Sequence, residues 1–213
     1  MSLVVKICGL KTQSALEAAV EEGADYVGFV FFPRSPRYIE PKKAKELGAL
    51  VPSNIKKVAV TVDASDQELD VIFRHFKPDV IQLHGSEDHE RIHALHRRFS
   101  LPVIKAVLVR SSDDIARGAA FAGIADMLLF DAKAPATSTL PGGNGIAFDW
   151  TLLKSRQFMV PWFLSGGLNL ENLEDAVRIS GTRAVDVSSS LEIEPGEKDP
   201  ELIRLFLQKA KAL

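Results

Sequence analysis

The sequence predicts an α/β protein folded as a single (β/α)8 TIM barrel. Eight short apolar runs alternate with amphipathic segments over 213 residues, and the runs are rich in valine and isoleucine. Near-continuous hydrophobicity of this kind is typical of parallel strands covered on both faces. No Gly-x-Gly-x-x-Gly follows the first run, which favours a closed barrel over the alternative, an open doubly wound sheet of eight strands. No linker divides the chain, and we expect residues 1–213 to form one domain.

The elements can be placed in chain order as eight repeats of a strand and a helix. Strands are predicted at residues 3–7, 25–30, 57–62, 79–83, 102–107, 126–130, 161–165 and 183–187. Gly23 lies where the first helix would end, and Gly181 lies where the helix before the last strand would end. Ser65 and Glu68 form a capping box that predicts a helix start after the third strand. Asp199 can cap the last helix.

Composition narrows the class of protein. Apolar residues make up 46% and charged residues 25%, as in an ordinary globular protein, and the net charge is -2. This balance argues against nucleic-acid or membrane-surface partners, which normally require a basic face. The single cysteine cannot form an internal disulfide, and we find neither a signal-peptide pattern nor a long apolar span. We expect a cytoplasmic protein, either a monomer or a homodimer.

The only cysteine, Cys8, directly follows the first predicted strand. Free cysteine is usually a small buried hydrophobe that does not react. In a (β/α)8 barrel, however, the active site lies at the C-terminal ends of the strands. Cys8 is therefore a candidate reactive thiol. Asp131 ends the sixth strand beyond three large apolar residues, where partial desolvation would let it hold a proton at neutral pH; a helix or turn cap is the alternative.

Other strand ends carry candidate binding residues. Arg34 and Arg37 lie in a proline-stiffened loop after the second strand, and a guanidinium suits a carboxylate or phosphate. His84 follows the fourth strand. The other four histidines fall in predicted helices, so no metal site can be built at these strand ends and we expect no metal.

Small residues gather after the last three strands. A long loop after Asp131 contains Gly142, Gly143, Asn144 and Gly145 and is a possible lid. Gly166 and Gly167 follow the seventh strand, and Ser188 and Ser189 follow Asp186 at the eighth. Barrels often bind phosphate between these last two loops, although plain turn chemistry would use the same residues.

Taken together, these segments resemble the phosphoribosylanthranilate isomerase family of tryptophan biosynthesis. The matching motifs, in the family's order, are Lys6-Ile7-Cys8-Gly9, Ser35-Pro36-Arg37, Gln82-Leu83-His84-Gly85, the Asp131 strand end, Phe148-Asp149-Trp150, Ser165-Gly166-Gly167-Leu168 and Asp186-Val187-Ser188-Ser189. They span nearly the whole chain.

The resemblance implies an Amadori rearrangement of a phosphorylated small molecule without a cofactor. Cys8 would be the general base and Asp131 the general acid. Arg37 would hold the anthranilate, with His84 and Asp186 also at the substrate. The Gly166-Gly167 and Ser188-Ser189 turns would hold the phosphate. A free thiol has a pKa of about 8.5, so we expect a nearby lysine or arginine to lower the pKa of Cys8, or substrate binding to assist.

Two positions depart from the family pattern. Asn144 stands where threonine is usual, and Ser190 stands where glycine is common. The second affects the phosphate loop, because serine accepts a positive φ less readily than glycine. Two other functions remain open: another sugar-phosphate isomerase or epimerase on the same barrel, and a phosphosugar-binding barrel without catalysis.

Overall fold

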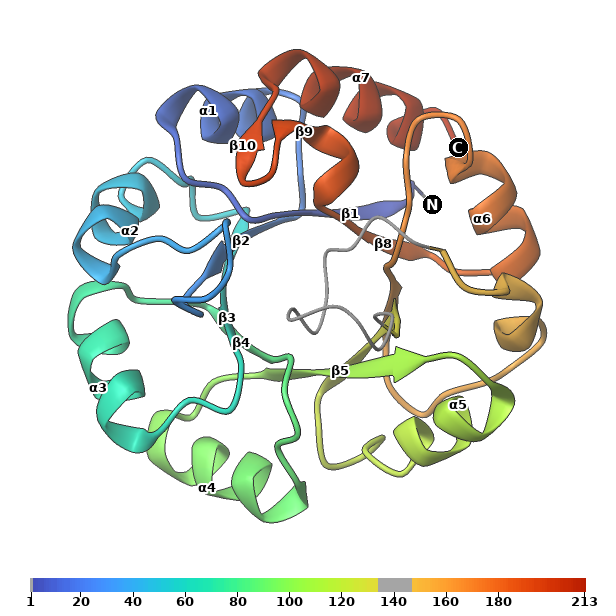
Figure 1. Cartoon of the computed structure of the whole chain (residues 1–213), viewed down its shortest axis with the longest axis horizontal. Coiled ribbons are helices and arrows are strands. Elements are labelled where there is room, and N and C mark those ends of the chain that lie inside the picture. The colour runs from blue at the N-terminus through green and yellow to red at the C-terminus, as the bar shows by residue number, and fades with distance from the viewer. Residues whose placement is uncertain (1, 134–146) are drawn as a thin grey trace.

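The chain forms a closed barrel of eight parallel strands surrounded by helices (Figure 1). The computed structural model describes residues 2–133 and 147–213. The strands are β1 (Val4–Cys8), β2 (Tyr26–Val30), β3 (Lys56–Thr61), β4 (Val80–Leu83), β5 (Val103–Val109), β6 (Met127–Ala132), β7 (Trp162–Leu164) and β8 (Ala184–Val187). Each pairs with its neighbours in sequence, and β8 pairs with β1 in a register that places Asp186 opposite Lys6. The predicted fold class and strand order are confirmed.

Seven α-helices lie in the described part of the chain. They are α1 (Gln13–Glu21), α2 (Pro41–Gly48), α3 (Asp66–His75), α4 (His89–Phe99), α5 (Ser112–Ala119), α6 (Leu173–Ser180) and α7 (Pro200–Lys211). The capping box that starts α3 and the Asp199 cap of α7 are both present. The four histidines expected in helices lie in α3 and α4.

The sequence predicted eight repeats of a strand and a helix. For the repeat between β6 and β7 this prediction is wrong over the described residues 147–161. Between β6 and β7 this segment holds only the 3-10 helix η1 (Trp150–Leu153). Asp131 also lies within β6, one residue before its end. Helix α6 begins at Leu173, because the side chain of Asn169 accepts hydrogen bonds from the backbone N–H groups of Glu171 and Asn172 and forms a turn first.

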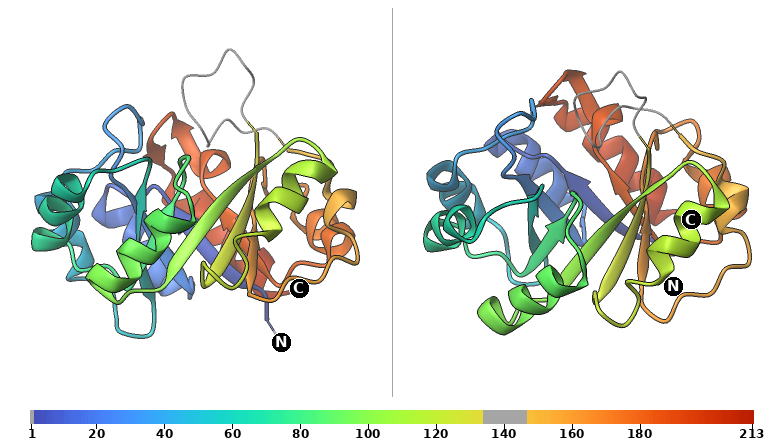
Figure 2. Two further views of the ribbon diagram at one scale, coloured as in Figure 1. Left: turned by 90° about the horizontal axis from the view of Figure 1, so that it is seen from below. Right: turned by 60° about the horizontal axis from the view of Figure 1, so that its bottom comes forward.

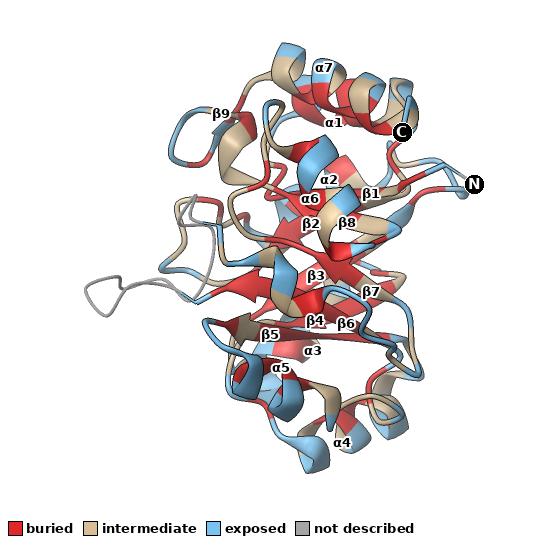
Figure 3. Cartoon of the chain, turned by 90° about the vertical axis from the view of Figure 1, so that its right-hand side faces the viewer, coloured by how far each residue is buried: buried red, intermediate tan, exposed pale blue. Residues whose placement is uncertain are grey.

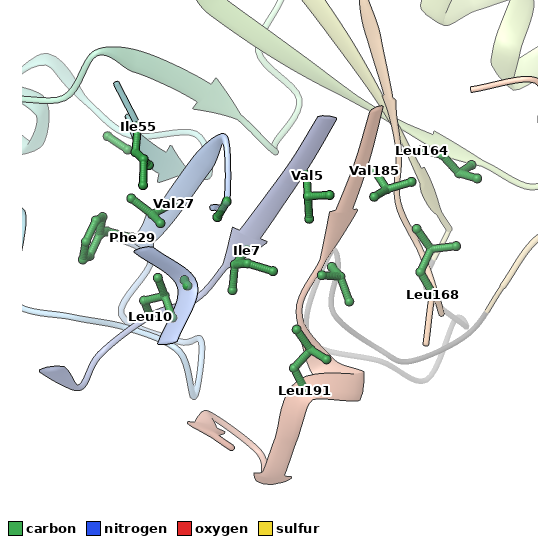
Figure 4. Packing of buried hydrophobic residues seen from close by; sticks show 14 of the residues in the cluster. Val5, Ile7, Leu10, Val27, Phe29, Ile55, Leu164, Leu168, Val185 and Leu191 are labelled. Carbon is green, nitrogen blue, oxygen red and sulfur yellow. The ribbon is translucent and has the colours of Figure 1, made fainter. Parts of the chain in front are cut away.

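The barrel has two apolar layers. Outward-facing residues such as Ile7, Phe29 and Val185 share one buried cluster with apolar residues of the helices. Figure 4 shows these three side chains on their strands. Buried residues run through the strands and the inner faces of the helices, while exposed residues lie on the outside (Figure 3). Inside the barrel, a second cluster includes Val58 and Leu129. Because side chains alternate along a strand, Asp131, two positions after Leu129 on β6, also points inward.

A short hairpin that the sequence did not reveal follows β8. The 3-10 helix η2 (Ser189–Leu191) leads into β9 (Glu192–Glu194), which pairs with β10 (Glu197–Lys198) in an antiparallel ladder. The hairpin lies at the end of the barrel where the parallel strands end, and both termini lie toward the opposite end (Figure 2). No helix in the described residues is long and apolar enough to span a membrane.

Candidate active site

Cys8 ends β1 and points into the barrel among charged groups. Its side chain is buried beside Lys6, which lies one inward position below it on the same strand. The Lys6 ammonium donates to Oδ1 of Asp186 at 2.8 Å, and both side chains are buried. Asp186, predicted to contact substrate, therefore already has a buried ionic partner.

The charges around Cys8 act in opposite directions on its thiol. Burial raises the pKa of Cys8 and is the largest influence, the positive charge of Lys6 lowers it, and the charge of Asp186 raises it again. The positive charge of Lys198 also lowers it. The expected lysine is present. The expected lowering of the Cys8 pKa is nevertheless wrong for the protein without ligand, because burial raises this pKa more than Lys6 and Lys198 lower it.

Two glycines make room for these groups. A Cβ atom on Gly28, in the neighbouring strand β2, would lie 3.0 Å from Sγ of Cys8 and 3.3 Å from Nζ of Lys6. Gly9 has φ +83°, and a Cβ atom there would lie 2.9 Å from Cδ of Arg37. Arg37 therefore crosses directly over the end of β1, next to Cys8.

Arg37 is buried and held by a carboxylate from the hairpin. Its Nε donates to Oε1 of Glu192 at 2.7 Å, and its Nη2 donates to Oε2 at 2.8 Å. Lys198 donates to the same Glu192 carboxylate. Burial favours the neutral form of Glu192, but Arg37 and Lys198 outweigh it and lower the pKa of this carboxyl. Arg34, the other arginine of this loop, is exposed.

Asp131 on β6 is separated from Asp186 on β8 by strand β7, and its charge is among the influences that raise the pKa of Asp186. Its Oδ1 accepts a hydrogen bond from the backbone N–H of Ala132 at 2.9 Å. Its Oδ2 lies 3.2 Å from Nε2 of His84, close enough for an ion pair although the two atoms are not aligned as a hydrogen bond. On its other side, Nδ1 of His84 lies 3.2 Å from Nε2 of Gln82. The imidazole thus lies between an amide and the carboxylate.

The two predicted phosphate turns also lie at this end of the barrel. Gly166 and Gly167 both have positive φ, and a Cβ atom on Gly166 would lie 3.0 Å from Oδ1 of Asp131. Ser190 has no positive φ, so the backbone strain considered for this departure is absent. Its hydroxyl donates instead to the carbonyl of Leu168 at 2.5 Å and joins the turn after β8 to the turn after β7.

The structure gathers the predicted residues of the described chain at one end of the barrel. The possible lid, Gly142, Gly143, Asn144 and Gly145, lies outside the described residues. Lys6, Gly28, Glu192 and Lys198 were missed. A lysine inside an apolar strand was a usable signal for Lys6, whereas nothing local marked the other three. Within the described ranges, no group of His, Cys, Asp or Glu residues is arranged to hold a metal ion.

Comparison with known proteins identifies the family. Residues 5–209 match the family model described as N-(5'phosphoribosyl)anthranilate (PRA) isomerase. The N-(5'-phosphoribosyl)anthranilate isomerases of Parvibaculum lavamentivorans and Rhodopseudomonas palustris are 49% and 52% identical to the chain. The first alignment covers 99% of both chains, and the second covers 100% of this chain and 97% of the relative.

Solved structures agree with this assignment. The crystal structure of phosphoribosyl anthranilate isomerase from Thermotoga maritima is 36% identical, with a TM-score of 0.88, and the match covers 99% of this chain and 100% of that one. A phosphoribosyl anthranilate isomerase in complex with reduced 1-(o-carboxyphenylamino)-1-deoxyribulose 5-phosphate is 34% identical, with a TM-score of 0.84 and the same coverage. The chain is an isomerase and belongs to the N-(5'-phosphoribosyl)anthranilate isomerase family.

Proposed function

We propose that the chain catalyses the Amadori rearrangement of N-(5'-phosphoribosyl)anthranilate to 1-(2-carboxyphenylamino)-1-deoxyribulose 5-phosphate in tryptophan biosynthesis. The observation that carries the proposal is the placement of one thiol and one carboxyl group on opposite sides of the same barrel opening. Cys8 comes from β1 and Asp131 from β6. A relative of this family binds a reduced form of the product, which supports the same chemistry here.

Asp131 acts as the general acid in the first step. It donates a proton to the furanose ring oxygen, the bond between that oxygen and C1′ breaks, and the anthranilate nitrogen lone pair forms a C1′–N double bond. The product is an open-chain iminium with a free hydroxyl group. The backbone N–H that donates to Oδ1 and the His84 ring beside Oδ2 hold the carboxyl group in one orientation, as a general acid requires.

Cys8 acts as the general base in the second step. Its thiolate removes the C2′ proton, and the C–H electron pair forms a C1′–C2′ double bond while the iminium nitrogen is neutralised. The resulting enolamine takes a proton at C1′ and releases the proton of its C2′ hydroxyl group, and the electron pair of that O–H bond forms the C2′=O double bond of the ketone. Burial raises the pKa of Cys8, so we infer that the thiolate forms mainly once the cationic iminium is present.

The two ends of the substrate would be held on either side of the sugar. Arg37 suits the aryl carboxylate, because a guanidinium pairs with carboxylate geometry. The turns at Gly166-Gly167 and Ser188-Ser189 suit the phosphate, because small residues let backbone N–H groups approach it. Fixing both ends would place C2′ and the ring oxygen near the base and the acid, which makes positioning a large part of the rate.

The test follows the loss of phosphoribosylanthranilate fluorescence, with substrate generated in situ, in the presence and absence of a chelator. We expect chelator-resistant turnover by the wild type, and a loss in Cys8→Ser and Asp131→Asn of about 10²-fold or more. Asp126→Asn is the matched control for the acid. It removes a carboxylate beside a histidine, His96 at 3.0 Å, at the other end of the same strand.

The outcomes separate three possibilities. Turnover in the wild type and Asp126→Asn, but not in the two site variants, supports the isomerase and its acid and base. Retained turnover in Cys8→Ser would contradict the role of the thiol. A folded wild-type protein that binds a sugar phosphate without turnover would overturn the proposed reaction and leave a binding protein.

A further inference from the structure

Glu192 and Lys198, on the hairpin β9–β10, lie outside the barrel strands and contact the residues at its opening. We propose that they are positioning residues that hold the Arg37 guanidinium in one orientation over the end of β1 and connect it to Cys8. The inference rests on the proposed function, in which Arg37 binds the aryl end of the substrate. It assigns a role to the hairpin, which the barrel itself does not need.

The first step of the argument is the geometry of the carboxylate. Glu192 accepts from both Nε and Nη2 of Arg37, at 2.7 and 2.8 Å, and this fork fixes the plane of the guanidinium as well as its place. The carboxylate is itself held by Lys198 and by the backbone N–H of Gly196 at 3.2 Å. Both acidic and basic partners are buried, so water does not loosen the contact.

The loop that carries Arg37 is also fixed against the hairpin. The backbone N–H of Arg37 donates to the Ser35 hydroxyl at 3.1 Å, and Lys11 donates to the carbonyl of Pro36 at 2.8 Å. Gly196, with φ +90°, is packed so closely that a Cβ atom would lie 2.2 Å from the same carbonyl. The hairpin thus contacts the arginine side chain through Glu192 and the backbone of its loop through Gly196.

Lys198 extends the arrangement to the thiol. Its ammonium lies 3.3 Å from the Ser188 hydroxyl, and that hydroxyl donates to the carbonyl of Cys8 at 3.0 Å. Three charged groups act on the thiol: Lys6 from β1, Asp186 from β8 and Lys198 from β10. Lys198 is the one that also contacts the carboxylate holding Arg37. A single side chain therefore contacts both the carboxylate that holds Arg37 and the hydroxyl group that donates to the carbonyl of Cys8.

The free-energy cost of burying these charged side chains indicates that the cluster has a functional role. Taking charges out of water costs several kcal/mol each, so buried ion pairs are poor devices for stability alone. An enzyme gains from such a cluster when it keeps a binding group oriented before substrate arrives. Positioning of Arg37 accounts for the two buried charges on this short hairpin, Glu192 and Lys198, where an apolar contact would hold the hairpin equally well.

The experiment compares Glu192→Gln and Lys198→Met with the wild type in two measurements. The first is KM and kcat for phosphoribosylanthranilate. The second is the pH dependence of iodoacetamide alkylation, which reports on Cys8 alone because the chain has one cysteine. We expect Glu192→Gln to raise KM about tenfold or more with kcat within about threefold, because the arginine loses its fork. Lys198→Met is expected to raise KM less and to move alkylation to higher pH.

Controls keep fold and charge separate from positioning. Lys57→Met removes another ion-paired lysine, 3.0 Å from Asp79 near the N-terminal end of β3, and is expected to change neither measurement. The double variant Glu192→Gln/Lys198→Met restores the charge balance without the fork. A raised KM in the double variant supports positioning, whereas recovery to the wild-type value would show that charge balance alone matters and overturn the proposal.

Other outcomes are equally decisive. A folded Glu192→Gln protein with wild-type KM would overturn the role of Glu192, and unchanged KM and alkylation in Lys198→Met would overturn that of Lys198. If Glu192→Gln does not fold, Glu192→Asp keeps the charge with a shorter reach and must still raise KM. Retained turnover in Cys8→Ser contradicts the proposed chemistry alone, because neither the KM shift nor the alkylation profile depends on Cys8 being the base.

Discussion

The two sides of the barrel opening surround their reactive groups with different chemistry. Around Cys8, the nearest side chains include the buried ion pair of Lys6 and Asp186 and the ammonium of Lys198. Around Asp131 they are an imidazole, a backbone N–H and the close approach of Gly166. A buried charge shifts the pKa of a neighbouring group strongly, whereas a hydrogen bond at a fixed position also orients it. Three charged side chains thus act on the pKa of the Cys8 thiol, whereas the contacts of Asp131 hold its carboxyl group in place, and the two sides are linked because the charge of Asp131 acts on Asp186.

The largest expected effect comes from removing the charge on the Cys8 side. Lys6→Met leaves Asp186 buried without its partner, and such a loss typically costs about 3–5 kcal/mol in the free energy of unfolding. Loss of the positive charge also raises the pKa of Cys8 further, so alkylation should shift to higher pH. Urea unfolding and iodoacetamide kinetics measure the two effects.

Lys105→Met is the matched control for this prediction. Lys105 on β5 is equally buried and pairs with Glu87 at 2.9 Å, but it is not among the groups that act on the thiol. It should lose comparable stability and keep the wild-type alkylation profile. An equal shift of the profile in both lysine variants would mean that loosened packing, rather than local charge, governs Cys8.

A smaller effect is expected from crowding the thiol without changing charge. In Gly28→Ala the new methyl group would lie 3.0 Å from Sγ of Cys8, so the thiol must move. The shift needed is a few tenths of an ångström, and because rates depend steeply on the placement of the reacting groups, we expect kcat to fall about threefold or more. Gly48→Ala introduces an equal 3.0 Å contact with the ring of Phe76, far from the opening, and kcat should stay unchanged. Steady-state kinetics of both variants checks the comparison.

The smallest effect is expected from removing the hydrogen bond between the turn after β8 and the turn after β7. The Ser190 hydroxyl donates to the carbonyl of Leu168, so Ser190→Ala frees the turn after β8 from the turn after β7. One hydrogen bond contributes about 1 kcal/mol, which corresponds to a several-fold rise in KM with little change in kcat. Ser180→Ala removes a similar bond, from its hydroxyl to the carbonyl of Ala176 within α6, and should leave KM unchanged. A KM that does not move in Ser190→Ala would show that the turns are held independently.

Much of the fold could be predicted because its signals are local. Parallel strands buried on both faces give apolar runs, and strand β1 is recognisable from five consecutive residues. The capping box at Ser65 acts within one helical turn and was found for the same reason. The prediction of a helix between β6 and β7 was wrong. It extended the regular alternation of strands and helices to a segment whose described residues contain η1 instead.

For the candidate site, too, the features with local signals could be predicted and those that depend on tertiary contacts could not. Cys8 and Asp131 could be singled out because the ends of barrel strands meet at one rim, whatever the details of packing. The direction of the Cys8 pKa could not, because it depends on how burial compares with charges brought in by β8 and β10. A single charged residue in a strand says nothing about its partner.

By itself, the sequence determined the (β/α)8 class, the strand order and the placement of a thiol, a carboxyl group and an arginine at strand ends. The spacing of apolar residues and the parallel direction of the strands are enough to predict these features. Tertiary structure alone decided that Lys6 pairs with Asp186 and that Arg37 pairs with Glu192, contacts between residues 180 and 155 positions apart. Such pairs exist only after the barrel closes in one register, because closure, rather than any local propensity, brings β1 and the segments after β2 and β8 together.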